Sequence, residues 1–456
     1  MTGESFSTDS LLQTAEQVLE LAKRAGAESA DVVVGGNTEF EVKVANQQIS
    51  TLTQATSKGL GVRLFIEGRA GFATTSDFSK DSLSALINHA TAITRELESD
   101  PFNGLAPADT GQWDADDALE IYDPLIGELS PNTKIEWAHA LEATARSASP
   151  YVTKFRDSGV ATGENVALLA TSDGVVRSSR STNIAAWTNP IAQKGDELQT
   201  ELWYDSKTHL EDLDSLEEIG ETAGHRAARM LGARPIKSQT IPVIFEPPMA
   251  AGLIAGILGA VNGDMVYKKS SFLTHRLHDI IATPGLTVVD DPHLLRGLAS
   301  TPFDGEGMKT FQKPIIEEGV LKTFLYDSYT ARKAGASNTA NGRRSYASTP
   351  HIGAFNFYVQ PGDIPPEEIL SSVPKAFLMT RGMGSGVDPV TGEYSRGASG
   401  FWVENGELCY PVQEVTIAGD FIEMLKNIDC IGSDLRMRGQ TGAPTIRIAE
   451  MTLSGS

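Results

Sequence analysis

The sequence is poor in cysteine, in long apolar runs and in positive charge, and each shortage argues against a class of protein. Cys409 and Cys430 are the only cysteines among 456 residues, too few for a disulfide framework, so a reducing compartment is expected. No apolar stretch approaches the roughly 20 residues that a membrane-spanning helix needs, and the first residues show neither the basic start nor the apolar run of a signal peptide. Lys and Arg total 38 against 59 Asp and Glu, for a net charge of −21, which opposes binding to nucleic acid or to an anionic membrane. We therefore expect a soluble, cytoplasmic protein with no nucleic-acid or membrane partner.

The chain is long enough for two or three domains, and its first half repeats one pattern. A helix, a group of strands and a second helix are predicted twice, from apolar residues at helical spacing and from alternating apolar and polar residues. The predicted helices cover residues 10–25, 81–96, 132–147 and 210–231, and the predicted strands cover residues 31–36, 39–44, 49–55, 61–66, 70–74 and a meander over 152–204. Residues 100–123, rich in Pro, Asp and Gly, are interpreted as a linker.

These patterns predict an α+β fold with an N-terminal α/β domain. That domain consists of two helix–strand meander–helix halves, residues 1–110 and residues 111–235, unless the second half forms a middle domain of its own. After residue 235, short strands separated by glycine predominate, with hairpin turns expected at Glu318-Gly319 and Asn405-Gly406. Residues 236–456 are therefore predicted to form a β-rich C-terminal domain.

One helix is expected inside the C-terminal domain. A short apolar run ends at Phe245, and Pro247-Pro248 then suits the first turn of a helix. No charged residue occurs from Met249 to Val261, and apolar residues surround the whole helix. We therefore expect this helix to be buried on all sides.

Two short cationic segments stand out in this acidic chain. Lys268-Lys269, followed by Ser270, comes directly after the buried helix and is a candidate wall of a substrate-binding site; the alternative is a solvent-exposed segment that leaves a core helix. Arg343-Arg344 is a compact cationic pair suited to bind a carboxylate of a peptide or of a partner; the alternative is a solvated turn. Together these five residues are the candidate substrate-binding residues.

Several short motifs resemble the TldD/PmbA family of metallopeptidases. They are Gly59-Leu-Gly-Val-Arg-Leu64, Gly71-Phe-Ala73, Gly263-Asp-Met-Val-Tyr-Lys-Lys-Ser-Ser-Phe-Leu273, Phe303-Asp-Gly-Glu-Gly307, Glu318-Gly-Val-Leu-Lys322, Thr391-Gly-Glu-Tyr-Ser395 and Val415-Thr-Ile-Ala-Gly419. Each motif alone is weak evidence, but their order and spacing from residue 59 to residue 419 follow the family. The resemblance implies an N-terminal α/β domain and a mainly β C-terminal domain.

The resemblance also bears on zinc. In the zinc-bearing TldD-type branch, the helix before Gly263-Asp264 carries His-Glu-x-x-x-His. The corresponding residues here are Ile254, Ala255 and Gly259, and none of them can bind a metal. Cys430 lies about where that branch has a further cysteine ligand, and without the histidines we interpret it as a small buried residue. The chain therefore resembles the PmbA/TldE-type branch, and we expect no catalytic residue and no metal of its own.

A second group of possible metal ligands lies in the C-terminal half. It consists of His275, His278, Asp290, Asp291 and His293, whose side chains are suitable ligands for zinc. The segment has the composition of a surface loop, in which histidines are commonly solvated. Whether this region binds a metal stays open at the level of the sequence.

The resemblance implies a PmbA/TldE-like subunit of a TldD/TldE-type metallopeptidase complex that takes part in proteolysis of unfolded or extended peptides. Zinc is then expected in a TldD-like partner chain and not in this chain. One alternative is a homodimeric peptide-binding or scaffold protein with no hydrolytic role. Another is a self-sufficient hydrolase that uses the 275–293 cluster.

Overall fold

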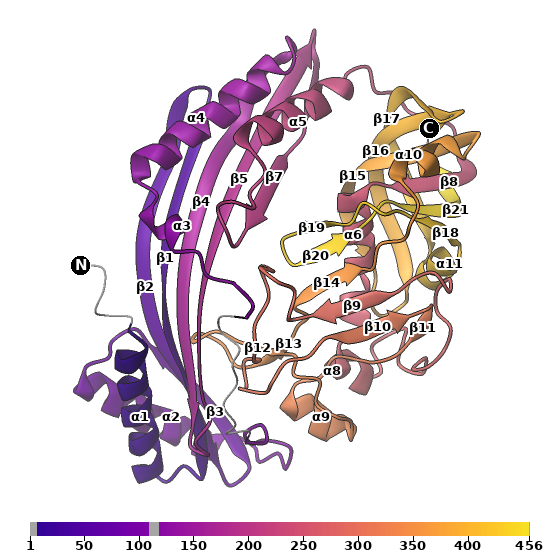
Figure 1. Cartoon of the computed structure of the whole chain (residues 1–456). Coiled ribbons are helices and arrows are strands. Elements are labelled where there is room, and N and C mark those ends of the chain that lie inside the picture. Colours follow the sequence, from indigo (N-terminus) through magenta and orange to yellow (C-terminus); the bar gives the residue numbers. More distant parts are fainter. Residues whose placement is uncertain (1–6, 109–117, 456) are drawn as a thin grey trace.

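The computed structural model describes residues 7–108 and 118–455. A long, curved sheet with helices on one face is built from the first half of the chain, and two smaller sheets with short helices are built from the second half (Figure 1). The predicted α+β fold with a β-rich C-terminal part is confirmed. In the part of the chain that the structure describes, no helix is both long and apolar enough to cross a membrane.

All strands of the first half belong to one seven-stranded antiparallel sheet. The helices of this half are α1 (Thr8–Arg24), α2 (Lys80–Glu96), α3 (Pro124–Glu128), α4 (Pro131–Ser147) and α5 (Leu216–Arg229). The strands are β1 (Ser29–Ala45), β2 (Gln48–Ile66), β3 (Arg69–Thr75), β4 (Val152–Thr171), β5 (Val176–Lys194), β6 (Glu197–Thr200) and β7 (Trp203–Lys207). Their order is β3-β2-β1-β4-β5-β6, with β7 also paired to β5. The two helix–strand–helix halves therefore share a single sheet.

Strands β1 and β2 are longer than the sequence pattern predicts. Four separate strands were expected between residues 31 and 66, but β1 and β2 pair continuously from Ser29 opposite Phe65 to Ala45 opposite Gln48. Gly35 lets β1 and β4 approach closely within this continuous sheet, since a Cβ at Gly35 would lie 2.4 Å from the carbonyl oxygen of Val166.

The helix predicted over residues 210–231 is shorter in the structure. It begins at Leu216, where the hydroxyl of Ser215 accepts a hydrogen bond from the backbone of Glu218 and caps the helix. Residues 210–214 form turns because the side chains of two aspartates accept hydrogen bonds from their backbone. Asp123 accepts from the N–H of Leu210 at 2.9 Å, and Asp205 accepts from the N–H of Asp214 at 3.0 Å.

Helices cover one face of the long sheet and leave the other face to the C-terminal part. Alternate residues of β1, among them Val32, Val34 and Val42, pack against α1, α2 and α4. Successive strand residues point to opposite faces, so Asp31 and Val33 point the other way. The uncovered face of β1 is thus available to the second half of the chain.

The second half contains two six-stranded sheets and a small hairpin. The first sheet has the order β11-β10-β9-β14-β20-β19, and the second has the order β17-β16-β15-β8-β21-β18 with a further pairing of β17 to β21. The strands are β8 (Gln239–Phe245), β9 (Val288–Asp291), β10 (Lys313–Glu317), β11 (Val320–Leu321), β12 (Gly342–Arg343), β13 (His351–Ile352), β14 (Asn356–Val359), β15 (Lys375–Val387), β16 (Glu393–Glu404), β17 (Glu407–Asp420), β18 (Ile428–Ile431), β19 (Arg436–Arg438), β20 (Thr441–Ala443) and β21 (Ile446–Ser454). The helices are α6 (Pro247–Ala255), α7 (Ile257–Ala260), α8 (Gly263–Tyr267), α9 (Ser328–Ala334), α10 (Pro366–Ser371) and α11 (Phe421–Lys426). Because β17 pairs with both β16 and β21, five strands of the second sheet close into a ring.

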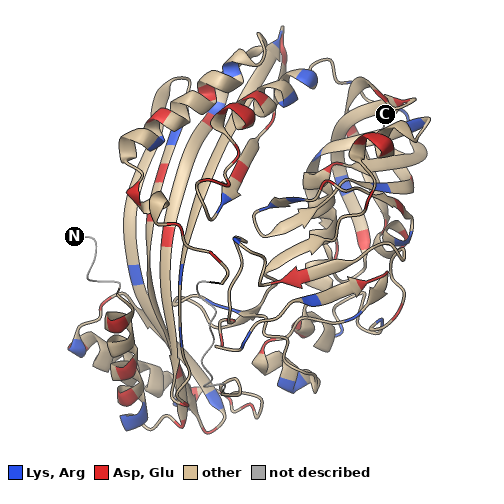
Figure 2. Cartoon of the chain, viewed as in Figure 1, with Lys and Arg blue, Asp and Glu red and all other residues tan. Residues whose placement is uncertain are grey.

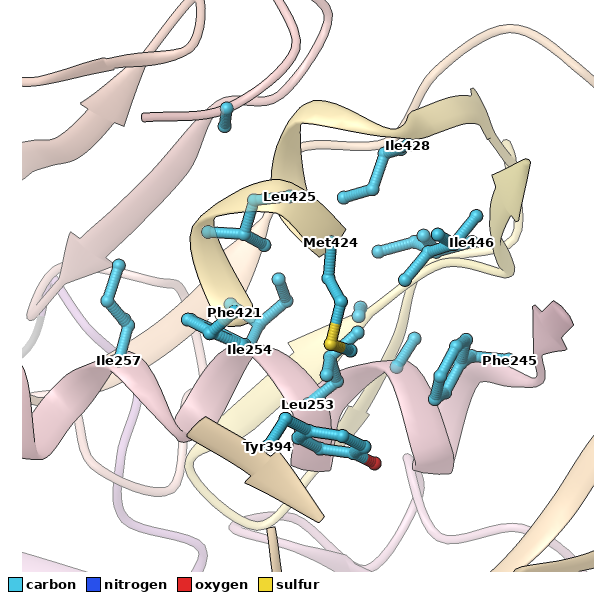
Figure 3. Packing of buried hydrophobic residues seen from close by; sticks show 14 of the residues in the cluster. Phe245, Leu253, Ile254, Ile257, Tyr394, Phe421, Met424, Leu425, Ile428 and Ile446 are labelled. Atoms are coloured by element: carbon cyan, nitrogen blue, oxygen red, sulfur yellow. The ribbon is translucent and has the colours of Figure 1, made fainter. Parts of the chain in front are cut away.

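The helix expected to be buried on all sides is interrupted and has one open face. Two short helices, α6 and α7, meet at Gly256. Leu253, Ile254 and Ile257 are buried and face the apolar side chains of α11 (Figure 3). Gly252 and Gly259, on the same two helices, are exposed. The prediction of complete burial was therefore wrong, because it treated these glycines as part of an apolar surface.

Candidate functional site

A cavity of about 660 Å³ lies between the uncovered face of the long sheet and the C-terminal part. The sheet wall comes from β1, β4, β5 and β7, and the opposite wall from residues 297–305 together with Arg343, Arg344 and Phe355. Its volume is within the 300–1,000 Å³ typical of small-molecule sites. We therefore take this cavity as the candidate functional site.

The sheet wall has no charged residue and combines a row of polar side chains with apolar residues such as Val33 and Leu169. Ser179, Ser181 and Asn183 alternate along β5 and line the cavity, because every second residue of a strand points to the same face. Asn165 of β4 lies opposite Ser181 in the register and extends this row to the neighbouring strand. This wall therefore offers hydroxyl and amide groups for hydrogen bonding.

A buried ion-pair network closes one end of the cavity and joins the two halves of the chain. Asp31 on β1 accepts hydrogen bonds from Arg63 Nη2 at 2.6 Å and from Arg344 Nη1 at 2.7 Å. Burial opposes the charge on Asp31, but the two guanidinium groups outweigh it and hold its pKa below the ordinary value. Asp31 is thus a carboxylate with a cation from each half of the chain.

Two further acids belong to the same network. Arg63 Nη2 also lies 3.4 Å from Glu306, which accepts a hydrogen bond from the backbone of Ser328 at 2.7 Å. Asp304 accepts three backbone N–H groups at 2.9–3.0 Å, those of Glu306, Met308 and Gly342. Burial and, next, the charge of Glu306 raise the pKa of Asp304 to about 7. Asp304 is therefore held in place and has no oxygen left without a hydrogen bond.

Arg343 differs from the other ionisable residues of the cavity. Its Nη1 donates to the carbonyl of Ala354 at 2.9 Å, and its guanidinium carbon lies 4.9 Å from the centre of the Phe355 ring. Within residues 7–108 and 118–455, Nε and Nη2 of Arg343 have no hydrogen-bond partner and no carboxylate forms an ion pair with it. Nε and Nη2 of Arg344 are buried and also have no hydrogen-bond partner there, but Arg344 has its counter-ion in Asp31. Burial lowers the pKa of Arg343, with partial compensation from Asp290. Arg343 is thus a positive charge at the cavity that forms no ion pair with the described residues.

The five candidate substrate-binding residues lie in two separate places. Arg343 and Arg344 line the cavity, and the side chain of Arg344 is fully buried, so the alternative of a solvated turn does not hold for that residue. Lys268, Lys269 and Ser270 follow α8 and are not part of the cavity lining; Lys268 forms an exposed ion pair with Asp264 at 2.7 Å. The structure therefore does not bring the two cationic segments into one site.

The residues that the family resemblance aligns with the zinc motif have no metal-binding side chain. Ile254 and Ala255 belong to α6 and Gly259 to α7, and their side chains contain no donor atom. Cys430, which is partly exposed, packs with Ile244 and Ile369 in a cluster separate from that of Ile254. Burial raises the pKa of the Cys430 thiol, which favours the protonated form that binds metals poorly.

The second group of possible ligands is not assembled. His275 and His278 are exposed, and His293 forms a hydrogen bond with Thr310 Oγ1 at 3.0 Å. Asp290 is buried and accepts from Asn341 Nδ2 at 2.8 Å, as well as from a backbone N–H and a lysine. Among the residues that the structure describes, no group of three or more His, Cys, Asp and Glu side chains is arranged to hold a metal ion. This structure gives no support to a hydrolase that uses the 275–293 cluster.

Sequence patterns did not identify Asp31, Arg63, Asp304 or Glu306 as site residues. The last two lie in the motif Phe303-Asp-Gly-Glu-Gly307, which was noted for its resemblance and not for its charge. Arg63, which contacts Glu306, is 243 positions away from it in the chain. Only the tertiary fold brings such residues together.

Comparisons with known proteins cover nearly the whole chain. The PmbA/TldA metallopeptidase domain 1 matches residues 30–94, the central domain matches residues 124–231 and the C-terminal domain matches residues 238–455. The chain is 32% identical over 446 residues to "Metalloprotease PmbA" of Escherichia coli O157:H7, covering 98% of this chain and 96% of that relative. It is 25% identical over 442 residues to "Metalloprotease TldD homolog" of Haemophilus influenzae, covering 88% and 87% respectively.

Solved structures have the same fold. A putative modulator of DNA gyrase from Bacteroides thetaiotaomicron superimposes with a TM-score of 0.90 at 26% identity, covering 99% of this chain and 100% of that one. TldE from Thermococcus kodakarensis superimposes with a TM-score of 0.87 at 21% identity, covering 97% and 100%. The matches over all three domains and the identity to PmbA show that this chain belongs to the PmbA/TldD metallopeptidase family.

Proposed function

We propose that this chain is a PmbA/TldE-like subunit of a TldD/TldE-type metallopeptidase complex that takes part in the proteolysis of unfolded or extended peptides in the cytoplasm. In this proposal a TldD-like partner supplies the zinc and the general base, and this chain contributes to binding the peptide. The observation that supports it is that Ile254, Ala255 and Gly259, which the resemblance aligns with the zinc motif, cannot bind a metal, while the chain matches all three family domains. A catalytic zinc needs three protein ligands and an open position, and these residues supply none.

The comparisons support a pair of related chains. One relative is named a TldD homolog, and one structure with the same fold is named TldE. A TldD-like chain of similar fold can therefore complement this one. The candidate residues for contact with the peptide are Lys268, Lys269 and Ser270 beside α8, and Arg343 and Arg344 at the cavity.

The test is to co-express this chain with a TldD-type chain from the same genome and to assay the purified mixture on an unstructured peptide. The mixture should cleave the peptide, and each chain alone should cleave it much more slowly. A chelator should stop the mixture, and added zinc should restore it, because the metal is the essential electrophile in such a reaction. Efficient cleavage by this chain alone, insensitive to chelators, contradicts the proposal.

A second candidate function, a homodimeric peptide-binding or scaffold protein, is favoured by the edge of the long sheet. Strand β3 pairs only with residues 60–66 of β2, so the outer edge of β2 from Gln48 to Lys58 has no strand partner among the described residues. This segment has no acidic residue, and β2 forms the outer edge in the view of Figure 2. Ile49 and Leu52 are 47% and 55% exposed. Lys58 is the only charged residue of this edge and lies at its end, so antiparallel pairing with the same edge of a second copy does not bring like charges opposite each other.

Sedimentation of the purified chain, at several concentrations, separates the two candidates. Under the second candidate the chain is a dimer, and Leu52→Lys shifts it toward a monomer because a charge is placed on the pairing edge. Glu39→Lys, on the neighbouring strand β1, is the matched control and should leave the dimer intact. A parent chain that stays monomeric at all concentrations excludes the homodimer.

A further inference from the structure

We infer that the cavity between the long sheet and the C-terminal part is a carboxylate-binding site, in which Arg343 binds the C-terminal carboxylate of an extended peptide. The inference rests on the proposed function only for the identity of the ligand as a peptide. The site itself follows from the charges, the geometry and the walls of the cavity.

The charges of the cavity leave one cation without a counter-ion. Three ionisable residues line it: Asp304, Arg343 and Arg344. Asp304 is saturated by three backbone N–H groups, and Arg344 is paired with Asp31. Arg343 alone among the three has neither an ion pair nor a full set of hydrogen bonds. Arg343 is partly buried and has no counter-ion, which is unfavourable for its charge, and a bound carboxylate supplies that counter-ion.

The orientation of Arg343 suits a carboxylate. Nη1 is occupied by the carbonyl of Ala354, and the ring of Phe355 lies beside the guanidinium. The two unpartnered nitrogens, Nε and Nη2, form one edge of the planar group, and this edge can donate two parallel hydrogen bonds to a carboxylate. Gly353 makes this arrangement possible, because a Cβ there would lie 2.8 Å from Cγ of Arg343.

The sheet wall suits the main chain of a peptide. Ser179, Ser181 and Asn183 repeat every second residue on β5, with Asn165 beside them on β4. A row of neutral donors and acceptors can bind backbone amides, and it has no charge with which to select particular side chains. We therefore expect peptides of different sequence to bind, provided that their C-terminal carboxylate is free.

The experiment measures binding by the full-length chain in a calorimeter, with three probes. N-acetyl-trialanine carries a peptide carboxylate, its C-terminal amide carries none, and acetate carries a carboxylate without a peptide. The free acid should bind at least about ten-fold more tightly than the amide, since a hydrogen-bonded charged pair is worth about 1.5–3 kcal/mol. Equal affinity for the acid and the amide overturns the inference. Acetate that binds as tightly as the peptide acid reduces the site to one for small carboxylates and overturns the assignment of a peptide.

Variants of Arg343 test the residue. Arg343→Gln removes the charge and should weaken binding of the peptide acid at least about ten-fold, while Arg343→Lys, which keeps the charge but not the two-nitrogen edge, should give an intermediate affinity. Arg24→Gln, an exposed arginine on α1, is the matched control and should bind as the parent does. If Arg343→Gln does not fold, the ranking of parent and Arg343→Lys still decides the matter. Undiminished binding in a folded Arg343 variant overturns the inference.

The outcome is separable from that of the proposed function. Suppose that the mixture with a TldD-type chain cleaves peptides, and that Arg343→Gln changes neither the affinity for the peptide acid nor the KM of the mixture. The subunit role then stands and the carboxylate site is rejected. If the mixture is inactive but the acid binds to the parent and not to Arg343→Gln, the site stands and the subunit role is rejected.

Discussion

The carboxylate of Asp31 lies 2.7 Å from Nη1 of Arg344, although 313 positions separate the two residues in the chain. Asp31 belongs to the long sheet, and Arg344 belongs to the C-terminal part. Both side chains are almost completely buried, so water does not compete with the ion pair. This contact holds the two walls of the cavity at a fixed separation.

Replacing Asp31 should destabilise the whole chain. Asp31→Asn leaves Arg344 without its anion and Arg63 with a single, longer contact to Glu306. Loss of one partner of a buried ion pair typically costs about 3–5 kcal/mol. The free energy of unfolding, measured with urea, should fall by that order. Glu20→Gln, which breaks an exposed pair with Arg24, is the control and should change little; similar losses in both variants show that burial of the Asp31 network is unimportant.

Stability should decrease as the pH rises through the range from about 4 to about 7. The pKa of Asp304 is raised from 3.8 to about 7 in the folded chain. Between these values the folded state binds more protons than the unfolded state, so deprotonation on raising the pH favours unfolding. Denaturant midpoints measured across this range should show a flatter decline for Asp304→Asn. Asp279→Asn, at an exposed position, should keep the slope of the parent; an unchanged slope in Asp304→Asn removes Asp304 as the cause.

A charge on the buried side of α6 should be tolerated much less well than the same charge on its open side. Ile254→Asp places a carboxylate among apolar side chains, which costs several kcal/mol against a typical total stability of about 5–15 kcal/mol. Gly252→Asp places a carboxylate at an exposed position. The Cβ of that aspartate would lie 3.3 Å from Nη1 of Arg396. Thermal melting should therefore drop sharply for the first variant only. Equal melting temperatures mean that Ile254 is not part of the core.

Restoring the zinc motif should not restore a zinc site. In the variant Ile254→His with Ala255→Glu and Gly259→His, the two histidines belong to different short helices, one buried and one exposed. A zinc site also needs a third ligand at about 2.0–2.3 Å and groups that orient the histidines. Metal analysis of the purified variant should find no stoichiometric zinc. One tightly bound zinc per chain shows that the remaining ligands were already in place.

The loop after α8 provides a test that depends on salt. If Lys268 and Lys269 attract peptide carboxylates, Lys268→Glu with Lys269→Glu should lower the rate of peptide turnover in the mixture with a TldD-type chain. The difference from the parent should shrink at high salt, because exposed charges are screened over about 10 Å at 0.1 M. An unchanged rate at low salt removes this loop from substrate binding and leaves the subunit role untouched.

Local elements were predictable because local chemistry determines them. The helix expected over residues 10–25 is α1, and the hairpin turns at Glu318-Gly319 and Asn405-Gly406 occur where they were expected. Gly319 and Gly406 have φ of 80° and 81°, a conformation that glycine adopts without strain. The family was also recognisable, because several motifs occur in a fixed order.

Long-range structure was less accessible to the sequence. The lengths of β1 and β2 depend on pairing along both edges of β1, which no local pattern reveals. The same holds for the site: Arg343 and Arg344 are adjacent cations in the sequence, but Arg344 forms an ion pair with Asp31 and Arg343 forms none among the described residues. Sequence reasoning treated the pair as one unit, and the fold gives the two residues different roles.

The ring of strands in the C-terminal part has a consequence for how the protein is made. Strand β8 ends at Phe245 and lies between β15 and β21, and β21 starts only at Ile446. On the ribosome, the nascent chain can complete the long sheet and α5 well before β21 is synthesised. One edge of β8 and part of β17 stay unpaired until then, because both pair with β21. During that interval an apolar strand with a free edge is exposed, the condition under which chains aggregate or recruit chaperones. Translation that stops before Ile446 therefore leaves a folded N-terminal half attached to an open barrel, a natural target for proteolytic quality control.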